Sequence, residues 1–336
     1  MKIQNRRYTG SKYKLMSWIK TLILENCPQH NSVFDVFGGT GVVTAELLDI
    51  SQANVINDFL FSNEIIYKAF FSRGRYGVSK IKAFQKKYEG LDSELLPENY
   101  VSENYGDKYF EKKAAKKIGF IREDIEVNRR QGNINEREFC ILLASLLYSM
   151  DRCANTVGHY EAYLRGKVNR TDFEFELVEP IKTQNLIRIY RKDANELARS
   201  IHADVAFVDP PYNSRQYSRF YHVLETITKW DKPKLEGTAL KPPEENMSEY
   251  CRNSAPAAFE DLISHLSVRY IVVTYNNTYD SKSSSSKNKI TLEQISEILG
   301  KKGETKVFEK KYHRFNAGKT DATNHKEFVF ITKVEE

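Results

Sequence analysis

The sequence predicts an α/β fold: a sheet of short strands with helices between them, a C-terminal antiparallel hairpin and a mostly helical insertion. Two stretches predict the sheet. Residues 32–43 follow the order strand, glycine-rich turn and helix, and residues 204–208 form a β-rich apolar run that ends at two prolines. Residues 306–312 and 327–332 are strand-like and predict the hairpin. Strand-like runs are few between residues 61 and 184, which predicts the insertion.

The composition is that of a soluble globular protein. Of the 336 residues, 40% are hydrophobic and 29% are charged. There is no run of about 18 apolar residues, and the first residues lack the hydrophobic centre of a signal peptide, so we expect a cytoplasmic protein with no membrane partner. The four cysteines are scattered without a Cys-x-x-Cys pair, which disfavours a zinc site and a disulfide framework, and no metal is expected.

The net charge of +6 is unevenly distributed. Residues 66–192 hold 24 Lys and Arg against 18 Asp and Glu, and the rest of the chain holds 27 of each. A basic middle segment suits a surface that meets phosphates, although many charge runs are only solvated faces. The candidates for phosphate contact are Lys112, Lys113, Lys116, Lys117, Arg129, Arg130, Arg165 and Arg170.

The glycine-rich turn after the first strand is a candidate ligand loop. Its sequence, Phe-Gly-Gly-Thr-Gly at residues 37–41, lets the backbone turn sharply and approach a ligand at the start of a helix. The spacing differs from Gly-x-Gly-x-x-Gly, which disfavours a nicotinamide dinucleotide. The next strand, residues 54–57, ends at Asp58, 17 residues past the last glycine. An acid at that place is positioned for ribose hydroxyls.

The Asp-Pro-Pro-Tyr sequence at residues 209–212 follows the strand at 204–208. Neither proline can donate a ladder hydrogen bond, so Asp209 is expected at the carboxyl end of the strand, where ligands bind in open α/β sheets. The exocyclic amine of adenine is a poor nucleophile with two N–H groups. The Asp209 carboxylate and the Pro210 carbonyl could accept both, while Tyr212 stacks on the base. The alternative is a strand that ends in a proline turn beside an exposed acid and aromatic.

Further segments carry weaker signals. Residues 6–15 read as a Gly-Ser turn before a helix, with Ser11 as its cap, and such a turn binds an anion or, more often, nothing. Residues 151–166 are dense in side chains that meet bases and phosphates, and the alternative is a polar loop that caps a helix. Residues 171–177 alternate as a strand would, and residues 91–107 are expected to form a loop.

Together these motifs resemble the Dam-like DNA adenine methyltransferases, which use S-adenosylmethionine. The resemblance runs from Arg6 to Lys333 and is strongest at residues 6–19, 33–43, 55–58 and 205–225. It implies a Rossmann-like methyltransferase sheet. The domains that it implies are a catalytic, S-adenosylmethionine-binding domain of residues 1–62 and 186–336 and an inserted DNA target-recognition domain of residues 63–185.

The resemblance also implies roles for individual residues. Asp209, Pro210 and Tyr212 match the catalytic motif. The matches to the cofactor site are Tyr8, Lys12, Phe37, Gly39, Gly41, Asp58, Asp193 and Asp209. Tyr8 and Ser11 stand where close relatives carry Trp and Gly. The candidates for DNA contact are Asn155, Thr156, His159, Tyr160, Arg165 and Arg215.

The implied activity is methyl transfer from S-adenosylmethionine to the N6 amine of a flipped-out adenine in double-stranded DNA. The expected context is a restriction–modification system, with a possible cognate restriction endonuclease; this chain itself shows no nuclease motif. RNA adenine methylation and DNA cytosine-N4 methylation are chemically close alternatives, because the same corner can hold either exocyclic amine. A non-catalytic DNA-binding protein is the alternative of a different class, and the intact Asp-Pro-Pro-Tyr motif disfavours it.

Overall fold

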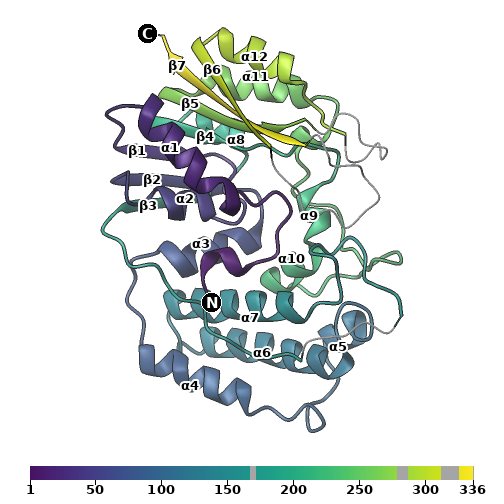
Figure 1. Cartoon of the computed structure of the whole chain (residues 1–336). Coiled ribbons are helices and arrows are strands. Elements are labelled where there is room, and N and C mark those ends of the chain that lie inside the picture. Colours follow the sequence, from purple (N-terminus) through teal and green to yellow (C-terminus); the bar gives the residue numbers. More distant parts are fainter. Residues whose placement is uncertain (167–171, 278–286, 312–324, 336) are drawn as a thin grey trace. The chain divides into compact units, whose positions relative to one another are not determined.

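A computed structural model describes residues 1–166, 172–277, 287–311 and 325–335, which divide into two compact units (Figure 1). The sheet unit consists of Ser11–Phe59, Gln184–Tyr217 and Asn246–Glu336. The helical unit consists of Met1–Gly10, Leu60–Thr183 and Ser218–Glu245.

Seven strands form one sheet in the order β3-β2-β1-β4-β5-β7-β6. The first five neighbours are parallel, and β7 runs antiparallel to both β5 and β6. The predicted fold class, with its C-terminal antiparallel hairpin, is therefore confirmed. The strand bounds are β1 Ser32–Asp35, β2 Ala53–Asp58, β3 Leu186–Arg191, β4 His202–Val208, β5 Ser267–Asn276, β6 Gly303–Lys311 and β7 Lys326–Val334.

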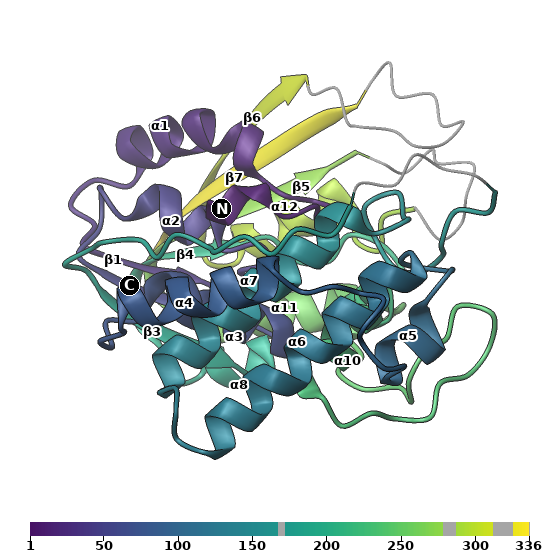
Figure 2. The ribbon, with the colours of Figure 1, turned by 90° about the horizontal axis from the view of Figure 1, so that it is seen from below.

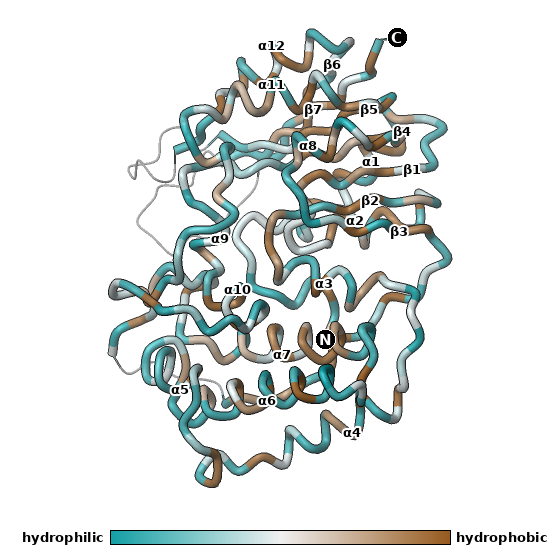
Figure 3. The backbone as a smooth tube through the Cα atoms, turned by 180° about the vertical axis from the view of Figure 1, so that it is seen from behind, coloured by the Kyte–Doolittle hydropathy of each residue, from teal (hydrophilic) through white to brown (hydrophobic). Residues whose placement is uncertain are grey.

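The central strands are buried on both faces, which explains why their sequences are continuously apolar. The last four residues of β4 and the last seven of β5 are all buried. Phe34, Ala206 and Ile271 pack in one core with Phe259 and Leu262 of a covering helix, and Figure 3 shows these strands as hydrophobic. The helices of this unit are η2 Tyr13–Leu15, α1 Met16–Asn26, α2 Val42–Leu47, α8 Ala194–Ala198, η3 Glu249–Cys251, α11 Ala255–His265 and α12 Leu292–Gly300.

The order in which the chain adds strands to the sheet reverses at β1. The chain passes from β1 to β2 and β3 on one side, and then to β4 and β5 on the other. The last residue of β1, Asp35, is in register with Ile56 of β2 and Phe207 of β4. The carboxyl ends of three parallel strands thus meet at one edge, the position at which open α/β sheets bind their ligands.

The helical unit is built around α7, whose residues are nearly all buried. Figures 1 and 2 show α3, α7 and α6 side by side. The side chain of Asn135 caps α7 and that of Glu138 reciprocates, which forms a capping box. The helices of this unit are η1 Ile3–Asn5, α3 Phe61–Phe71, α4 Val78–Glu89, α5 Tyr100–Tyr105, α6 Lys112–Arg130, α7 Glu136–Cys153 and α10 His222–Lys229, while α9 Tyr217–Phe220 begins in the sheet unit.

The compact units differ from the expected domain bounds at residues 1–10 and 218–245, which both fall in the helical unit. The buried guanidinium of Arg122 on α6 donates to the carbonyls of Ile227 (2.7 Å) and Thr228 (3.2 Å), at the carboxyl end of α10. The Tyr148 hydroxyl on α7 donates to the Ile3 carbonyl (2.8 Å). Polar side chains of the insertion therefore hold these two flanking segments.

Three local predictions are wrong. Residues 172–177 form no strand: the N–H groups of Glu176 and Val178 donate to Ser149 and Ser145 of α7 instead of to a neighbouring strand, and Thr171 lies outside the described residues. The expected loop at 91–107 contains α5. Ser11 caps no helix, because α1 begins only at Met16 after the turn η2.

In the part of the chain that the structure describes, no helix is both long and apolar enough to cross a bilayer. Nor is any group of three or more His, Cys, Asp or Glu side chains among those residues arranged to hold a metal ion.

Candidate functional site

The glycine-rich turn leaves β1 at the carboxyl edge of the sheet and is fixed to the end of β2. The Gly38 N–H donates to the Asn57 carbonyl (2.7 Å), and the Gly39 N–H donates to the Asp58 carboxylate (2.8 Å). Gly39 and Gly41 have φ angles of 52° and 77°, in the left-handed region that glycine adopts readily. Asp58 thus joins the two segments that the sequence predicted to bind one ligand.

The last residue of β1, Asp35, is a buried carboxyl that the sequence analysis did not single out. Its Oδ2 accepts a 2.8 Å hydrogen bond from the Thr44 hydroxyl on α2, and its Oδ1 has no hydrogen-bond partner. The pKa of Asp35 is raised to about 7, chiefly by burial; the hydrogen bonds from Thr44 act against burial, and the charges of Asp209 and Asp58 act with it. The sequence signal that could have identified Asp35 is its place: an acid at the end of a strand, directly before the glycine-rich turn.

The Asp-Pro-Pro-Tyr corner follows β4, and three donors converge on its carboxylate. Lys12 Nζ lies 2.8 Å from Asp209 Oδ2, and the Thr274 hydroxyl on β5 donates to Oδ1 at 2.8 Å. The Tyr212 hydroxyl donates to the same Oδ1. The side chain of Lys12 is only 4% exposed and that of Asp209 16%, so this ion pair is largely shielded from water. The corner therefore holds one oriented carboxylate.

Two opposing effects set the charge of Asp209. Burial raises the pKa of its carboxyl above the ordinary value, and the Lys12 cation and the hydrogen bonds from Lys12, Tyr212 and Thr274 work against burial. Burial and the neighbouring carboxylate together hold the pKa of Tyr212 well above its ordinary value. Tyr212 is consequently a neutral donor to Asp209 near neutral pH.

The Tyr212 ring is fixed on several sides within the sheet unit. The Tyr275 ring meets it edge to face, with centroids 4.7 Å apart and planes at 71°. The Lys12 ammonium lies 4.9 Å from the Tyr212 ring centroid and donates to its hydroxyl at 2.5 Å. The Tyr212 carbonyl accepts from the Lys289 N–H (2.8 Å). Lys12, predicted only as a cofactor residue, is thus a direct partner of both Asp209 and Tyr212.

Phe37 and Asp193 lie near Tyr250, which the sequence analysis missed. The Phe37 and Tyr250 rings meet edge to face at 5.0 Å, and the Tyr250 hydroxyl donates to Asn195 Oδ1 (2.7 Å). Asp193 caps α8 by accepting from the N–H groups of Asn195 (2.9 Å) and Glu196 (3.1 Å). Tyr250 lies buried in η3, in a stretch of sequence without any motif, so no sequence signal could have found it.

Tyr8 belongs to the helical unit, where its ring stacks on Tyr221 with centroids 4.7 Å apart and planes at 4°. The buried guanidinium of Arg6 lies 5.0 Å from the Tyr8 ring centroid and 5.4 Å from that of Tyr221. The Tyr221 hydroxyl also accepts from the Thr9 N–H (2.8 Å). Cation–π and stacking contacts of this kind fix the orientation of Tyr8.

The segment 155–165 uses part of its polar side chains internally. Asn155 Nδ2 donates to the carbonyls of Lys108 (3.0 Å) and Leu164 (2.8 Å). The fully buried Tyr160 donates to Asp151 (3.0 Å). Both side chains are buried and bonded within the protein, although Asn155 Oδ1 has no hydrogen-bond partner. This arrangement disfavours DNA contact by Asn155 and Tyr160, which stays a prediction.

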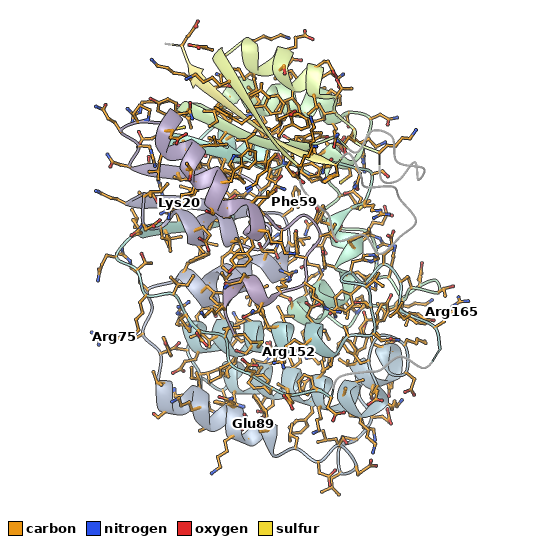
Figure 4. The ribbon with its side chains drawn as sticks, in the orientation of Figure 1. Lys20, Phe59, Arg75, Glu89, Arg152 and Arg165 are labelled. Carbon is orange, nitrogen blue, oxygen red and sulfur yellow. The ribbon has the colours of Figure 1, made fainter. Side chains whose placement is uncertain are left out.

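The remaining DNA candidates differ in their exposure. Thr156 is buried too, which likewise disfavours contact with a base. His159 is half-buried, with its ring 4.2 Å from that of Phe220. Arg165 is exposed at the surface of the helical unit (Figure 4), while Arg215 is half-buried in the sheet unit.

The basic residues of α6 are mostly paired with acids. Lys113 lies 2.7 Å from Glu94, and Lys112 and Lys116 lie 2.8 Å and 3.4 Å from Glu98. Arg129 and Arg130 pair with Glu136 (2.9 Å) and Glu126 (3.2 Å). Exposed pairs are weak and can exchange partners, but these acids offset part of the positive charge of the α6 surface. Arg170 lies outside the described residues.

Comparisons with known proteins match the chain to DNA methyltransferases or modification methylases. The model of one protein family, described as D12 class N6 adenine-specific DNA methyltransferase, matches residues 8–277. The Type II methyltransferase M.NlaIII of Neisseria lactamica is 30% identical over 336 residues, which cover 95% of each chain. Modification methylase LlaI of Lactococcus lactis subsp. lactis is 31% identical over 81% of this chain and 46% of its own length.

The Type II methyltransferase M.FokI of Planomicrobium okeanokoites is 31% identical over 96% of this chain and 52% of its own length. The chain thus spans about half the length of LlaI and M.FokI, but 95% of M.NlaIII.

Proposed function

Because the chain belongs to the D12 class of N6 adenine-specific DNA methyltransferases, we propose that it methylates the N6 amine of an adenine in duplex DNA with S-adenosylmethionine. The observation that supports this most is the Asp209 carboxylate, held at the carboxyl edge of the sheet by Lys12, Tyr212 and Thr274. A carboxylate fixed in this way is an acceptor that needs no reorganisation when an amine N–H meets it.

The sheet edge fits the cofactor. Left-handed glycines at 39 and 41 permit close backbone approach, and the buried Asp35 Oδ1 is an acceptor without a protein partner. The residues proposed to hold the cofactor are Tyr8, Lys12, Phe37, Gly39, Gly41, Asp58 and Asp193. Bound there, S-adenosylmethionine supplies a methyl group on a positively charged sulfur.

The chain's own contribution is to hold the amine. The Asp209 carboxylate and the Pro210 carbonyl accept the two N–H groups, which directs the nitrogen lone pair away from the ring and toward the cofactor. Positioning of this kind supplies most of the acceleration in a direct displacement, with no covalent enzyme intermediate. Lys12 favours the ionised form of Asp209, against burial, which favours the neutral acid.

The target amine is inaccessible inside a duplex, so the adenine must leave the stack. Extrusion costs a few kcal/mol, and stacking on Tyr212 offsets part of that cost. Replacing the base opposite the target by a mismatch lowers the cost, so we expect tighter binding to the mismatched duplex. Equal affinity for matched and mismatched duplexes would argue against extrusion.

Identification of the methylated nucleoside tests the proposal directly. In two parallel reactions, the protein is incubated with radiolabelled S-adenosylmethionine together with either duplex DNA or RNA. The products of each reaction are then digested to nucleosides. We expect label in N6-methyladenine from DNA. Label in N4-methylcytosine, or label from RNA alone, would replace the proposal by one of the two close alternatives.

We further propose that the protein is the modification part of a restriction–modification system, because its relatives are named as modification and Type II methylases. Single-molecule sequencing of the DNA of a host expressing the protein would then show adenine methylation at one short sequence. Methylation scattered without a consensus would contradict that role. His159, Arg165 and Arg215 are the residues proposed for DNA contact within this scheme.

A further inference from the structure

Three carboxyl groups stand at the same edge of the sheet: Asp35 ends β1, Asp58 ends β2 and Asp209 follows β4. The three carboxyl groups differ in the cations and hydrogen-bond donors that surround them. Lys12 lies beside Asp209 at 2.8 Å, and Asp58 accepts the Gly39 N–H. Asp35, on the strand between β2 and β4, is bonded among the described residues by Thr44, whose hydroxyl and backbone N–H are both uncharged donors.

Asp35 is also the most deeply buried of the three, with 1% of the residue exposed and Oδ1 without any hydrogen bond. A lone buried carboxylate is costly unless it is paired, and it avoids the cost by taking up a proton. The charged groups that act on Asp35 from the packed elements are Asp209 and Asp58, which are both acids and therefore favour the protonated form.

We propose that Asp35 senses the charge of the cofactor: it holds a proton in the free protein and releases that proton when S-adenosylmethionine binds. The inference rests on the proposed function. S-adenosylmethionine carries a sulfonium, an ammonium and a carboxylate, for a net charge of one. The demethylated product, S-adenosylhomocysteine, has a neutral thioether and no net charge. An ionised Asp35 therefore favours the substrate form of the cofactor over the spent form.

The sign of the pH dependence follows from the linkage between proton release and binding. The pKa of Asp35 is raised to about 7 in the free protein, and a bound cation lowers it. Below that pH, binding must expel a proton, so affinity for S-adenosylmethionine rises with pH and then levels off above about 7. Full release of one proton corresponds to a change of about tenfold in affinity per pH unit.

Binding titrations of both cofactor forms between about pH 5.5 and 7.5 test the proposal, below the range in which an α-amino group titrates. Calorimetry in two buffers of different ionisation enthalpy counts the protons released. Asp35→Asn keeps the shape of the side chain but cannot ionise. Thr44→Val keeps the shape of Thr44 but removes the bond that favours the ionised form. The matched control is Asp49→Asn, which removes a surface carboxylate of the same unit, paired with Lys20.

In the wild type and in Asp49→Asn, we expect the affinity for S-adenosylmethionine to rise with pH and its ratio to that for S-adenosylhomocysteine to rise as well. In Asp35→Asn, both the excess slope and the proton release should disappear. In Thr44→Val, the pH at which affinity levels off should move upward. The Thr44 variant keeps Asp35 itself, so it tests the idea even if Asp35→Asn folds poorly.

The inference is overturned if wild type and Asp35→Asn release the same number of protons and show the same ratio of affinities across the range. If titration of Asp209 alone caused the pH dependence of cofactor affinity, that dependence would persist in Asp35→Asn. This result would count against the assignment to Asp35. Absence of binding of either cofactor form to the wild type is a different result, which would contradict the proposed function instead.

Discussion

Replacing Lys12 by Met should shift the pH range in which the protein is active. The Lys12 ammonium lies 2.8 Å from the Asp209 carboxylate, and both side chains are shielded, at 4% and 16% exposed. An opposite charge at such a distance lowers the pKa of a carboxyl by about 1–3 units, equivalent to about 1.4–4 kcal/mol. Methionine has a similar length and no charge, so the substitution removes the cation and leaves the packing.

The direction follows from the state of Asp209 that the mechanism requires. The ionised Asp209 carboxylate is a much stronger acceptor for the amine N–H than the neutral acid, and burial already raises its pKa. Without Lys12 the pKa of Asp209 rises further. As the pH falls, the variant therefore loses activity at a higher pH than the wild type does. We expect the acid limb of the pH profile to move upward by about 1–3 units, with activity partly regained at alkaline pH.

Single-turnover methylation of duplex DNA, measured from pH 5 to 9 at saturating S-adenosylmethionine, checks this expectation, because saturation removes any effect of Lys12 on cofactor affinity. Lys20→Met is the matched control, since Lys20 lies on α1 of the same unit and pairs with the exposed Asp49. Thr274→Val should give a smaller shift in the same direction. An acid limb of Lys12→Met that coincides with that of the wild type would refute the role given to Lys12.

Three further predictions concern single contacts. Asp58→Ala should weaken S-adenosylmethionine binding by about 1–3 kcal/mol in equilibrium titrations, because both the Gly39 N–H and the ligand lose a charged acceptor. Unchanged affinity would remove Asp58 from the site. Tyr212→Phe should lower single-turnover rates about tenfold or more, because its hydroxyl donates to Asp209, and Tyr212→Ala should be worse because stacking is lost as well; equal rates for the two variants would show that the ring does not stack. Arg165→Ala should reduce the salt dependence of DNA affinity by about one phosphate contact, whereas Lys113→Ala, paired with Glu94, should change it less; the reverse order would move the DNA surface to α6.

The motifs at strand ends could be predicted because their chemistry is local. A strand followed by glycines, an acid closing the next strand, and two prolines after an apolar run each fix the backbone within a few residues. The sheet edge then brings them together through the general behaviour of parallel strands. Lys12 could be assigned to the site in this way, but its contact with Asp209 joins residues about 200 positions apart, and no local pattern encodes it.

The sequence is least informative where burial, rather than residue type, decides what a side chain does. Asn155 and Tyr160 have the chemistry of DNA contacts, yet the fold uses them to satisfy the backbone carbonyls of Lys108 and Leu164 and the carboxylate of Asp151. The alternating residues 172–177 lack a neighbouring strand and bond to the serines of α7. Residues 218–245 group with the helical unit, where the buried Arg122 holds the end of α10, and no local pattern of that segment indicates this contact.

The central claim is that the Asp209 carboxylate holds the target amine while the methyl group is transferred. Single-turnover transfer from labelled S-adenosylmethionine to duplex DNA, measured with Asp209→Asn and paired with a binding titration of the cofactor, tests it most directly. We predict that the variant binds S-adenosylmethionine within a few fold of the wild type and forms no detectable N6-methyladenine. Near-normal methylation by Asp209→Asn, with the cofactor bound, would contradict the account.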